Sequence, residues 1–205
     1  MSEQTPITAQ QRGFKYQIWL MLIIVFGVIA TGFIMVPKTE QERQALIDRM
    51  GTTNMGKLVK PSVNLSPLLA PLATQDKPKW QILIAGGSGC DSGCEQMLHD
   101  TKQIHMLLGK LTGRVKRLYL PDTEQLETIN LEQLSQQHPF LQVSAIDSSL
   151  LSSMLQNSSA DWDMQDSRYF VVTPDHRAVL YYQSNDDANG LLDDLKHLLK
   201  YSPDR

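Results

Sequence analysis

The chain has 205 residues, a formal net charge of -3 and 20% charged residues. It carries no bulk excess of Lys and Arg, which removes the electrostatic argument for a nucleic-acid-binding protein. The length allows one domain of ordinary size together with additional segments.

The first predicted element is a single transmembrane anchor at residues 15–37, behind a polar tail at residues 1–14. Residues 18–36 are uncharged and overwhelmingly apolar, and as a helix they would extend roughly 28 Å, close to the hydrocarbon thickness of a bilayer. The run is longer than the apolar core of a signal peptide, and no polar stripe interrupts it as in a buried helix of a globular domain. Tyr16 and Trp19 occupy the position of an interfacial aromatic belt. Basic residues flank the anchor on both sides, so charge does not decide its orientation.

Residues 38–79 are predicted to form a short helix followed by a proline-rich linker. Thr39 and Glu42 have the spacing of a capping box, and Gly51 is a natural helix stop. The following prolines favour extended segments and turns leading into a domain; they are Pro61, Pro67, Pro71 and Pro78.

Residues 80–205 alternate between strand-like and helix-like patterns. Strands are predicted at 80–86, 114–121 and 140–146, and helices at 91–111, 123–137 and 147–156. Residues 168–183 read as a hairpin around Pro174–His176, and residues 189–205 as a final amphipathic helix. This order indicates an α/β domain with a central sheet.

Both cysteines, Cys90 and Cys94, lie where the first strand of this domain gives way to its first helix. Positions four apart on a helix have Cβ atoms about 5–6 Å apart, whereas a disulfide needs about 3.8 Å. A disulfide would therefore require the first turn to relax, for example at Gly93, while two thiolates around a soft Cu(I) ion need less adjustment. Asp91 and Glu95 oppose the positive potential of the helix start, so the acidity of the thiols stays open.

Other kinds of site find less support in the sequence. A structural zinc site needs four ligands, which the histidines do not supply. The glycines around the cysteines miss the dinucleotide-binding spacing, and Ser88 lacks the context of a hydrolase nucleophile. Met97 is expected in the core, and the basic residues Arg114, Lys116 and Arg117 are expected at a solvated edge.

The pattern of a strand, a Gly-rich turn, a C-x3-C pair opening a helix and a final hairpin with helix resembles the thioredoxin-like fold of the Sco/SenC proteins. The resemblance covers about 80–205 and implies a central mixed sheet flanked by helices. A segment T-N-x-G-x-L-x-x-P, here Thr53 to Pro61, and later G-K and R-V-x-R pairs resemble a small membrane protein encoded among bacterial oxidase assembly genes. The resemblance implies a factor in the bacterial inner membrane, with the N-terminus in the cytoplasm and the domain in the periplasm. Its implied partners are the lipid bilayer and a cytochrome c oxidase subunit or other assembly factors, without nucleic acid.

The resemblance to Sco-type proteins extends to only some of their functional residues. Cys90 and Cys94 match the two thiol ligands of copper in Sco-type proteins, but Gln165 or Asp166 stands where those proteins have a histidine. His176 is expected in the hairpin turn and His138 before a strand, both far from the thiols. The cis-proline that thioredoxins have before the hairpin is also missing.

Three hypotheses therefore stay open. Cys90 and Cys94 hold Cu(I) for delivery to a copper-containing oxidase; or they exchange disulfides with oxidase cysteines, with Cys90 attacking; or the domain is a non-catalytic scaffold.

Overall fold

The computed structural model describes residues 9–35, 54–72, 77–86 and 90–202. The chain divides into two compact units, Met1–Thr53 and Asn54–Arg205. The predicted short helix at 39–51 lies outside the described residues.

The described part of the first unit is one long helix, α1 (Ala9–Met35). Its segment Tyr16–Phe33 has a mean hydropathy of 2.0, and none of that segment is buried inside the protein. By length and composition this helix could cross a membrane. It begins at Ala9, inside the segment for which the sequence predicted only a polar tail.

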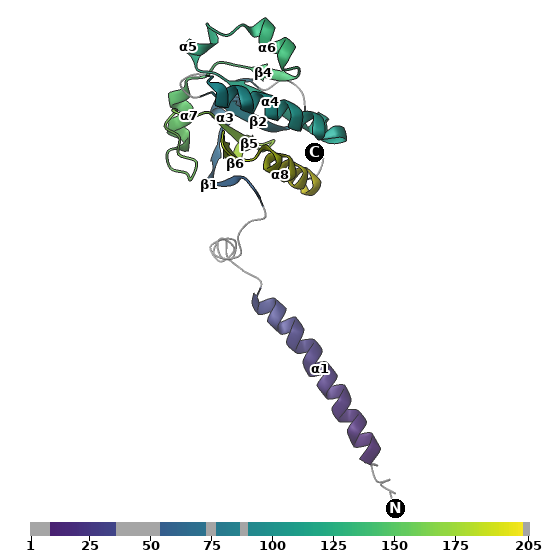
Figure 1. The fold of residues 1–205 in the computed structure, drawn as a ribbon. Coiled ribbons are helices and arrows are strands. Elements are labelled where there is room, and N and C mark those ends of the chain that lie inside the picture. Colours follow the sequence, from purple (N-terminus) through teal and green to yellow (C-terminus); the bar gives the residue numbers. More distant parts are fainter. Residues whose placement is uncertain (1–8, 36–53, 73–76, 87–89, 203–205) are drawn as a thin grey trace, which may run out of the picture. The chain divides into compact units, whose positions relative to one another are not determined.

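The second unit is built on a six-stranded mixed sheet with the order β1-β6-β5-β2-β3-β4 (Figure 1). β2, β3 and β4 are parallel to one another, while β5, β6 and β1 continue the sheet in antiparallel pairs. The strands are β1 (Lys57–Asn64), β2 (Trp80–Ala85), β3 (Val115–Leu120), β4 (Leu141–Val143), β5 (Arg168–Val172) and β6 (Arg177–Gln183). The predicted fold class is confirmed.

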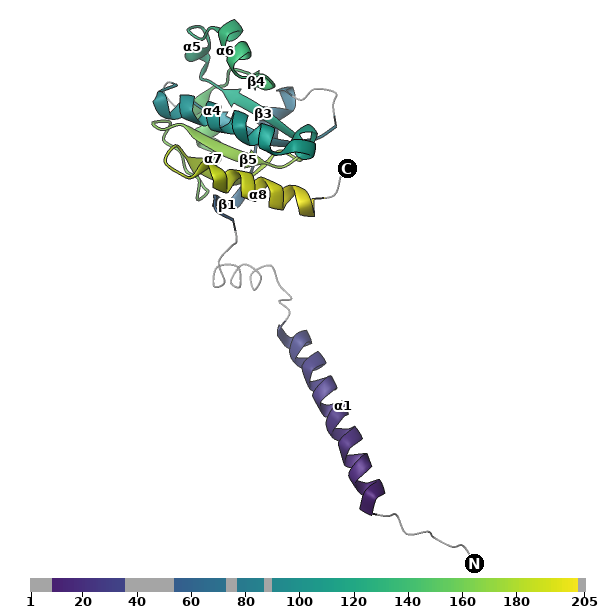
Figure 2. The ribbon, with the colours of Figure 1, turned by 45° about the vertical axis from the view of Figure 1, so that its right-hand side comes forward.

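Helices cover both faces of the sheet because its central strands have buried side chains on both sides. In β2, Ile82 and Ile84 face α4 (Ser92–Leu107) and α8 (Ala188–Tyr201), which lie side by side over one face (Figure 2). Leu83 and Ala85 face α3 (Ser66–Leu69) and α7 (Ser148–Leu155) on the other. The short 3₁₀ helices are η1 (Ala70–Leu72) and η2 (Gly109–Arg114).

The domain begins earlier than its predicted start at residue 80. β1 lies in the segment predicted as a linker, yet it pairs with β6 and contributes to the second unit. Its proline forms a cis Lys60–Pro61 peptide bond. A proline is tolerated here because β1 is an edge strand, where a missing N–H breaks no pairing on the open side.

The N-terminal end of β1 is attached to α8 through Asp194. The carboxylate of Asp194 accepts hydrogen bonds from the Met55 and Gly56 amides at 3.0 and 2.9 Å, and from the Tyr182 hydroxyl at 2.5 Å. A Cβ atom on Gly56 would lie 2.4 Å from the Tyr182 ring, so only glycine fits. These contacts give Gly56, the glycine of the T-N-x-G segment, a structural role.

The segment between β3 and β4 contains two short helices instead of the single helix predicted at 123–137. They are α5 (Thr123–Leu126) and α6 (Leu131–Gln137). Asn130 separates them, because its side chain accepts a hydrogen bond from the Gln133 amide and so starts a new helix.

Arg117 is not at a solvated edge, as the sequence predicted, but completely buried in the middle of β3. Its guanidinium donates hydrogen bonds to the Leu98 carbonyl at 2.7 Å and the Thr101 hydroxyl at 3.1 Å, both on α4. Burial lowers the pKa of Arg117 to about 10. The alternation of Val115, Arg117 and Tyr119 on the face covered by α4 was the signal for this placement.

Candidate functional site

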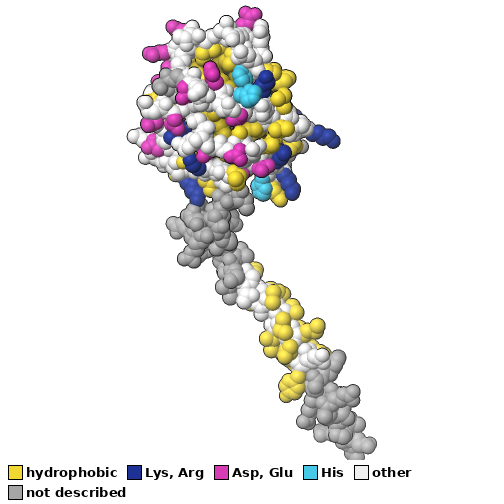
Figure 3. All heavy atoms as spheres, viewed as in Figure 1, with side chains coloured by type: hydrophobic (Ala, Val, Ile, Leu, Met, Phe, Trp, Pro, Cys, Tyr) yellow, Lys and Arg dark blue, Asp and Glu magenta, His cyan; other side chains and the backbone are white. Residues whose placement is uncertain are grey.

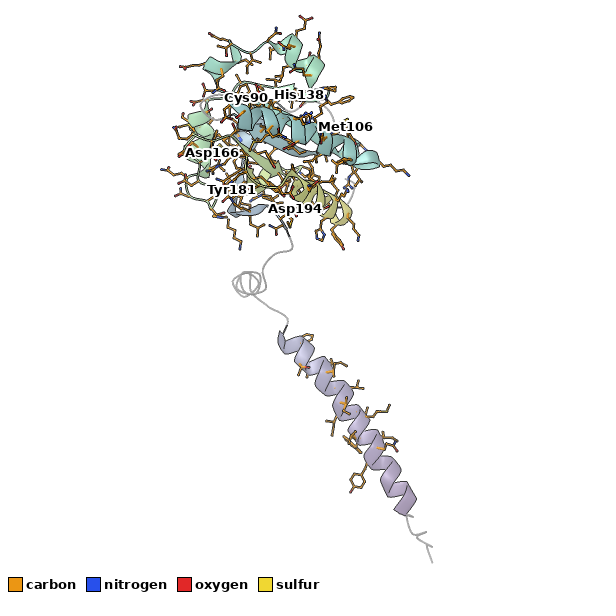
Figure 4. The ribbon with its side chains drawn as sticks, in the orientation of Figure 1. Cys90, Met106, His138, Asp166, Tyr181 and Asp194 are labelled. Atoms are coloured by element: carbon orange, nitrogen blue, oxygen red, sulfur yellow. A yellow bond between two sulfur atoms is a disulfide. The ribbon has the colours of Figure 1, made fainter. Side chains whose placement is uncertain are left out.

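Cys90 and Cys94 form a disulfide at the start of α4, with an S–S distance of 2.03 Å and a Cα–Cα distance of 5.0 Å (Figure 4). The two residues differ sharply in accessibility, since Cys90 is exposed and Cys94 is completely buried. Only one of the two sulfurs is therefore open to a partner molecule.

The helix begins after Cys90, which corrects the expectation that both cysteines share one helical face. Asp91 is the N-cap residue, and its carboxylate accepts a hydrogen bond from the Cys94 amide at 2.9 Å. Cys90 thus precedes the cap in non-helical backbone, so the first turn does not have to unwind. The Cα separation of the pair falls within the range that disulfides need.

The buried sulfur of Cys94 contacts Tyr119 on β3. The Tyr119 hydroxyl oxygen lies 3.8 Å from Cys94 Sγ. Burial raises the pKa of Tyr119 to about 12, so the phenol keeps its proton and can donate to sulfur. Gly86, which follows β2, leaves room for this ring, because a Cβ atom there would lie 3.0 Å from the hydroxyl oxygen. The sequence did not identify Tyr119 as part of the site, because only the pairing register of β2 and β3 brings its side chain next to Cys94.

Two carboxylates lie next to the cysteines in the sequence at the start of α4. Asp91 caps the helix, and Glu95 lies in its first turn. The loop after β6 also packs on this turn, because a Cβ atom on Gly93 would lie 3.1 Å from Ser184, and Asp186 and Asp187 follow in the same loop. Nearby negative charge disfavours a thiolate, and the Asp91 carboxylate already takes one of the free amides that would otherwise stabilise it.

Gln165 and Asp166, which stand where Sco-type proteins have a histidine, make local contacts. The Asp166 carboxylate pairs with Arg168 at 3.1 Å, and the backbone N–H of Gln165 donates a hydrogen bond to the Asp163 carboxylate. His176 lies in the β5–β6 turn, at the end of the sheet opposite to the cysteines, with φ at 62°. Within the described residues, no group of three or more His, Cys, Asp or Glu side chains is placed to hold a metal ion.

Met97 and three further histidines make other contacts. Met97 belongs to the core between α4 and the sheet. His138 lies on the side of α4 that faces α6 and β4 (Figure 4). His105 binds the Val115 carbonyl at the start of β3, and His197 contacts the Tyr201 ring on α8. The site therefore consists of the cysteine pair, Tyr119 and the surrounding carboxylates.

Comparison with known families and structures places this arrangement in context. Residues 80–202 match the family described as "Transmembrane-like, thioredoxin-like, C-terminal domain". No curated protein sequence matches the chain.

Several solved structures have a similar fold at low sequence identity. Copper-bound ScoI of Arabidopsis thaliana is 19% identical, with a TM-score of 0.46 over 60% of this chain and 86% of that one. Copper-bound yeast Sco1 is 15% identical, with a TM-score of 0.46 over 61% of this chain and 78% of that one. A DsbF homologue from Corynebacterium diphtheriae is 15% identical, with a TM-score of 0.45 over 63% and 75%. At these identities the similarity is one of fold.

Proposed function

Because the chain belongs to the family of transmembrane-like, thioredoxin-like C-terminal domains, we propose that it is a membrane-anchored thiol–disulfide exchange protein with Cys90 and Cys94 as its reactive pair. The observation that supports this best is the disulfide itself, in which an exposed sulfur is joined to a buried one. Exchange needs this asymmetry, because one sulfur must meet the partner while the other stays nearby to release it.

The exchange would proceed in two displacements. The Cys90 thiolate attacks one sulfur of a client disulfide, so a mixed disulfide forms and the other client sulfur leaves as a thiolate. The Cys94 thiolate then attacks Cys90 Sγ, and the first client sulfur leaves in turn. Two electrons pass from the pair to the client, whose thiolates take up protons, and Cys90 and Cys94 end as the disulfide seen here. A protein dithiol on the same side of the membrane would return the pair to its reduced form.

The two sulfurs also allow a second candidate function, in which the reduced pair carries Cu(I) as cargo. Both sulfurs belong to one short segment at the start of α4, and thiolates are the ligands that Cu(I) prefers. Two ligands would bind the ion loosely enough to pass it on. This candidate depends on the reduced pair, because a disulfide sulfur is a poor ligand.

We place either activity in the assembly of a copper-containing cytochrome c oxidase, at the periplasmic side of a bacterial inner membrane. The apolar helix α1 supports a single-pass anchor, and a disulfide persists in the periplasm but rarely in the cytoplasm. The clients would be cysteines of an oxidase subunit or of another assembly factor, as the resemblance in sequence implies.

A trapping experiment tests the exchange function. The Cys94→Ser variant should accumulate a mixed disulfide through Cys90, because no second thiol can release the client. The matched Cys90→Ser variant should accumulate none, since Cys94 is buried. Mixed disulfides are detected as complexes that disappear on reduction. Equal trapping by both variants, or trapping by neither, would contradict the assignment.

An anaerobic Cu(I) titration against a chromogenic chelator tests the second candidate. The reduced full-length chain should take up one Cu(I), while the oxidised chain and the Cys90→Ser, Cys94→Ser double variant should take up none. If copper binding is the same in all three samples, the pair does not carry copper. If the cysteine-free chain still supports oxidase assembly in cells, the domain acts as a scaffold.

A further inference from the structure

A basic groove lies at the end of the sheet opposite to the disulfide. Two adjoining hollows of about 170 and 400 Å³ open there, around the start of β2 and β3. Lys79, Lys116 and Gln142 line both hollows, which adjoin at these residues from the two faces of the sheet and are together called the basic groove. The groove shares no residue with the site of Cys90 and Cys94.

The charged side chains that line this basic groove are lysines. They are Lys77, Lys79 and Lys116, and no Asp or Glu is present among its described lining residues. The chain as a whole has the opposite sign, with a net charge of -3. Three lysines thus lie together at this end of a protein whose net charge is negative.

The pKa values of two histidines, of which His105 lines the groove, are consistent with these positive surroundings. The pKa of His105 is lowered mainly by burial, and further by the charges of Arg117 and Lys79. The pKa of His138 is also lowered mainly by burial, and further by Arg117, Lys102 and His99. The main charged groups that act on these two imidazoles lower their pKa values, as cations do. An anionic group bound nearby would offset this repulsion.

The groove also offers apolar surface. Leu69, Leu72 and Leu118 line one hollow, and Leu141 and Phe140 the other. The Phe140 side chain is 82% exposed. Its backbone has φ at 64°, a conformation that a phenylalanine rarely adopts. A large apolar side chain held in this way beside lysines can contact a partner that presents both carboxylates and apolar groups.

From this combination we propose that the basic groove binds an acidic peptide segment of a partner protein, with an apolar side chain of that segment against Phe140. The charge complementarity selects carboxylates, and the two adjoining hollows give room for a few residues of chain. An anionic membrane surface fits less well, because it is broad and cannot enter a groove around strand ends. This proposal is independent of the exchange chemistry, since the two sites lie at opposite ends of the sheet.

Fluorescence anisotropy with a defined probe tests the proposal. The probe is a labelled heptapeptide, Glu-Leu-Asp-Phe-Glu-Leu-Asp, added to the full-length chain in detergent. Binding should weaken at least tenfold in Lys79→Glu, which reverses a charge of the groove, and several-fold in Phe140→Asn, which keeps a residue tolerant of positive φ. Lys196→Glu is the matched control, because Lys196 is an exposed lysine of α8 outside the groove. It should leave binding unchanged.

Further measurements distinguish specific peptide binding from an effect of net charge and from membrane binding. A peptide with Gln and Asn in place of Glu and Asp should not bind, and its equal binding would overturn the proposal. Equal weakening by Lys79→Glu and Lys196→Glu would also overturn it, because net charge alone would then explain the affinity. If nanodiscs with phosphatidylglycerol suppress peptide binding to the wild type relative to phosphatidylcholine nanodiscs, a membrane is the occupant and the proposal fails. The Cys90→Ser, Cys94→Ser variant should bind the probe normally whatever the outcome of the exchange experiments.

Discussion

At the scale of single residues, the contact between Tyr119 and Cys94 connects the core to the chemistry. The hydroxyl lies 3.8 Å from the buried sulfur, and the phenol stays protonated because burial raises its pKa to about 12. A hydroxyl donor stabilises a thiolate more than a thiol, because hydrogen bonds to charged groups are the stronger ones. Tyr119 would therefore favour the reactive form of Cys94 where the neighbouring carboxylates oppose it.

Replacing this hydroxyl tests its effect on sulfur. In a Cys90→Ser background, Tyr119→Phe should raise the pKa of the Cys94 thiol, measured from the ultraviolet absorbance of the thiolate as a function of pH. Tyr182→Phe is the control, because the Tyr182 hydroxyl bonds to Asp194 instead. If both variants shift the titration equally, the effect comes from a general loosening of the core and not from the hydroxyl.

Gly56 is the residue on which the attachment of β1 depends. Gly56→Ala should destabilise the domain by about 1–3 kcal/mol, the usual effect of overpacking, because the new methyl would overlap the Tyr182 ring. Denaturant unfolding of the full-length chain measures the change. Gly113→Ala should have little effect, since no atom lies within 4 Å of a Cβ atom there. Equal stability of the two variants would show that the contact with Tyr182 is not limiting.

At the scale of elements, the segment from α5 to β4 covers a cationic interior. His138 of this segment shares the Leu98 carbonyl with Arg117, and Lys102 and His99 of α4 also act on it. Within the described residues, Nη1 of Arg117 and Nδ1 of His138 are buried without a hydrogen-bond partner. The attachment of the segment therefore depends on a neutral imidazole.

This dependence predicts a loss of stability in acid. Because the pKa values of His138 and His105 in the folded domain are below the ordinary 6.5, their contribution is complete above about pH 6.5. It is lost as the pH falls from 6.5 through the lowered values. The denaturation midpoint should be lower at pH 5 than at pH 7.5, and His138→Gln should reduce the difference. His197→Gln, on the exposed side of α8, should leave the difference as in the wild type; the interpretation fails if both variants behave alike.

The sequence predicted most elements of this domain, because their apolar patterns are strong. The strands around Ile82 and Leu118 and the last helix, which contains Leu199, lie where periodicity placed them. It did not predict β1, since the prolines of that segment suggested a linker and the pairing with β6 spans more than a hundred residues. Nor did it predict that the Asp91 side chain caps α4, which leaves Cys90 in the non-helical backbone before the helix. Such features depend on distant contacts and on single capping bonds, which periodicity does not report.

At the scale of the whole molecule, charge is unevenly distributed over the second unit. Acidic side chains gather toward the end where α5 and α7 lie (Figure 3), and Asp91, Glu95 and Asp186 belong to the disulfide end. The lysines of the basic groove lie at the other end. Molecules that approach the two ends would therefore be selected by opposite charge.

The proposed topology gives a prediction for the intact cell. In a Cys94→Ser variant, a membrane-impermeant maleimide added to spheroplasts should label Cys90, which is exposed and would face the periplasm. A Ser2→Cys variant without the native cysteines should react only after the membrane is opened. Protection of Cys90 together with labelling at position 2 would reverse the proposed orientation.

The place of β1 at the margin of the sheet has a practical consequence for anyone who shortens this protein. Starting the chain at Trp80, where the family match begins, would remove β1, the edge strand that pairs with β6. The unpaired backbone amides and carbonyls of β6 would then pair with other copies of the chain, as exposed edge strands do when proteins aggregate. The buried core residues Leu65 and Leu69 would also be lost. A soluble fragment should therefore start no later than Asn54, and one started at Trp80 should precipitate.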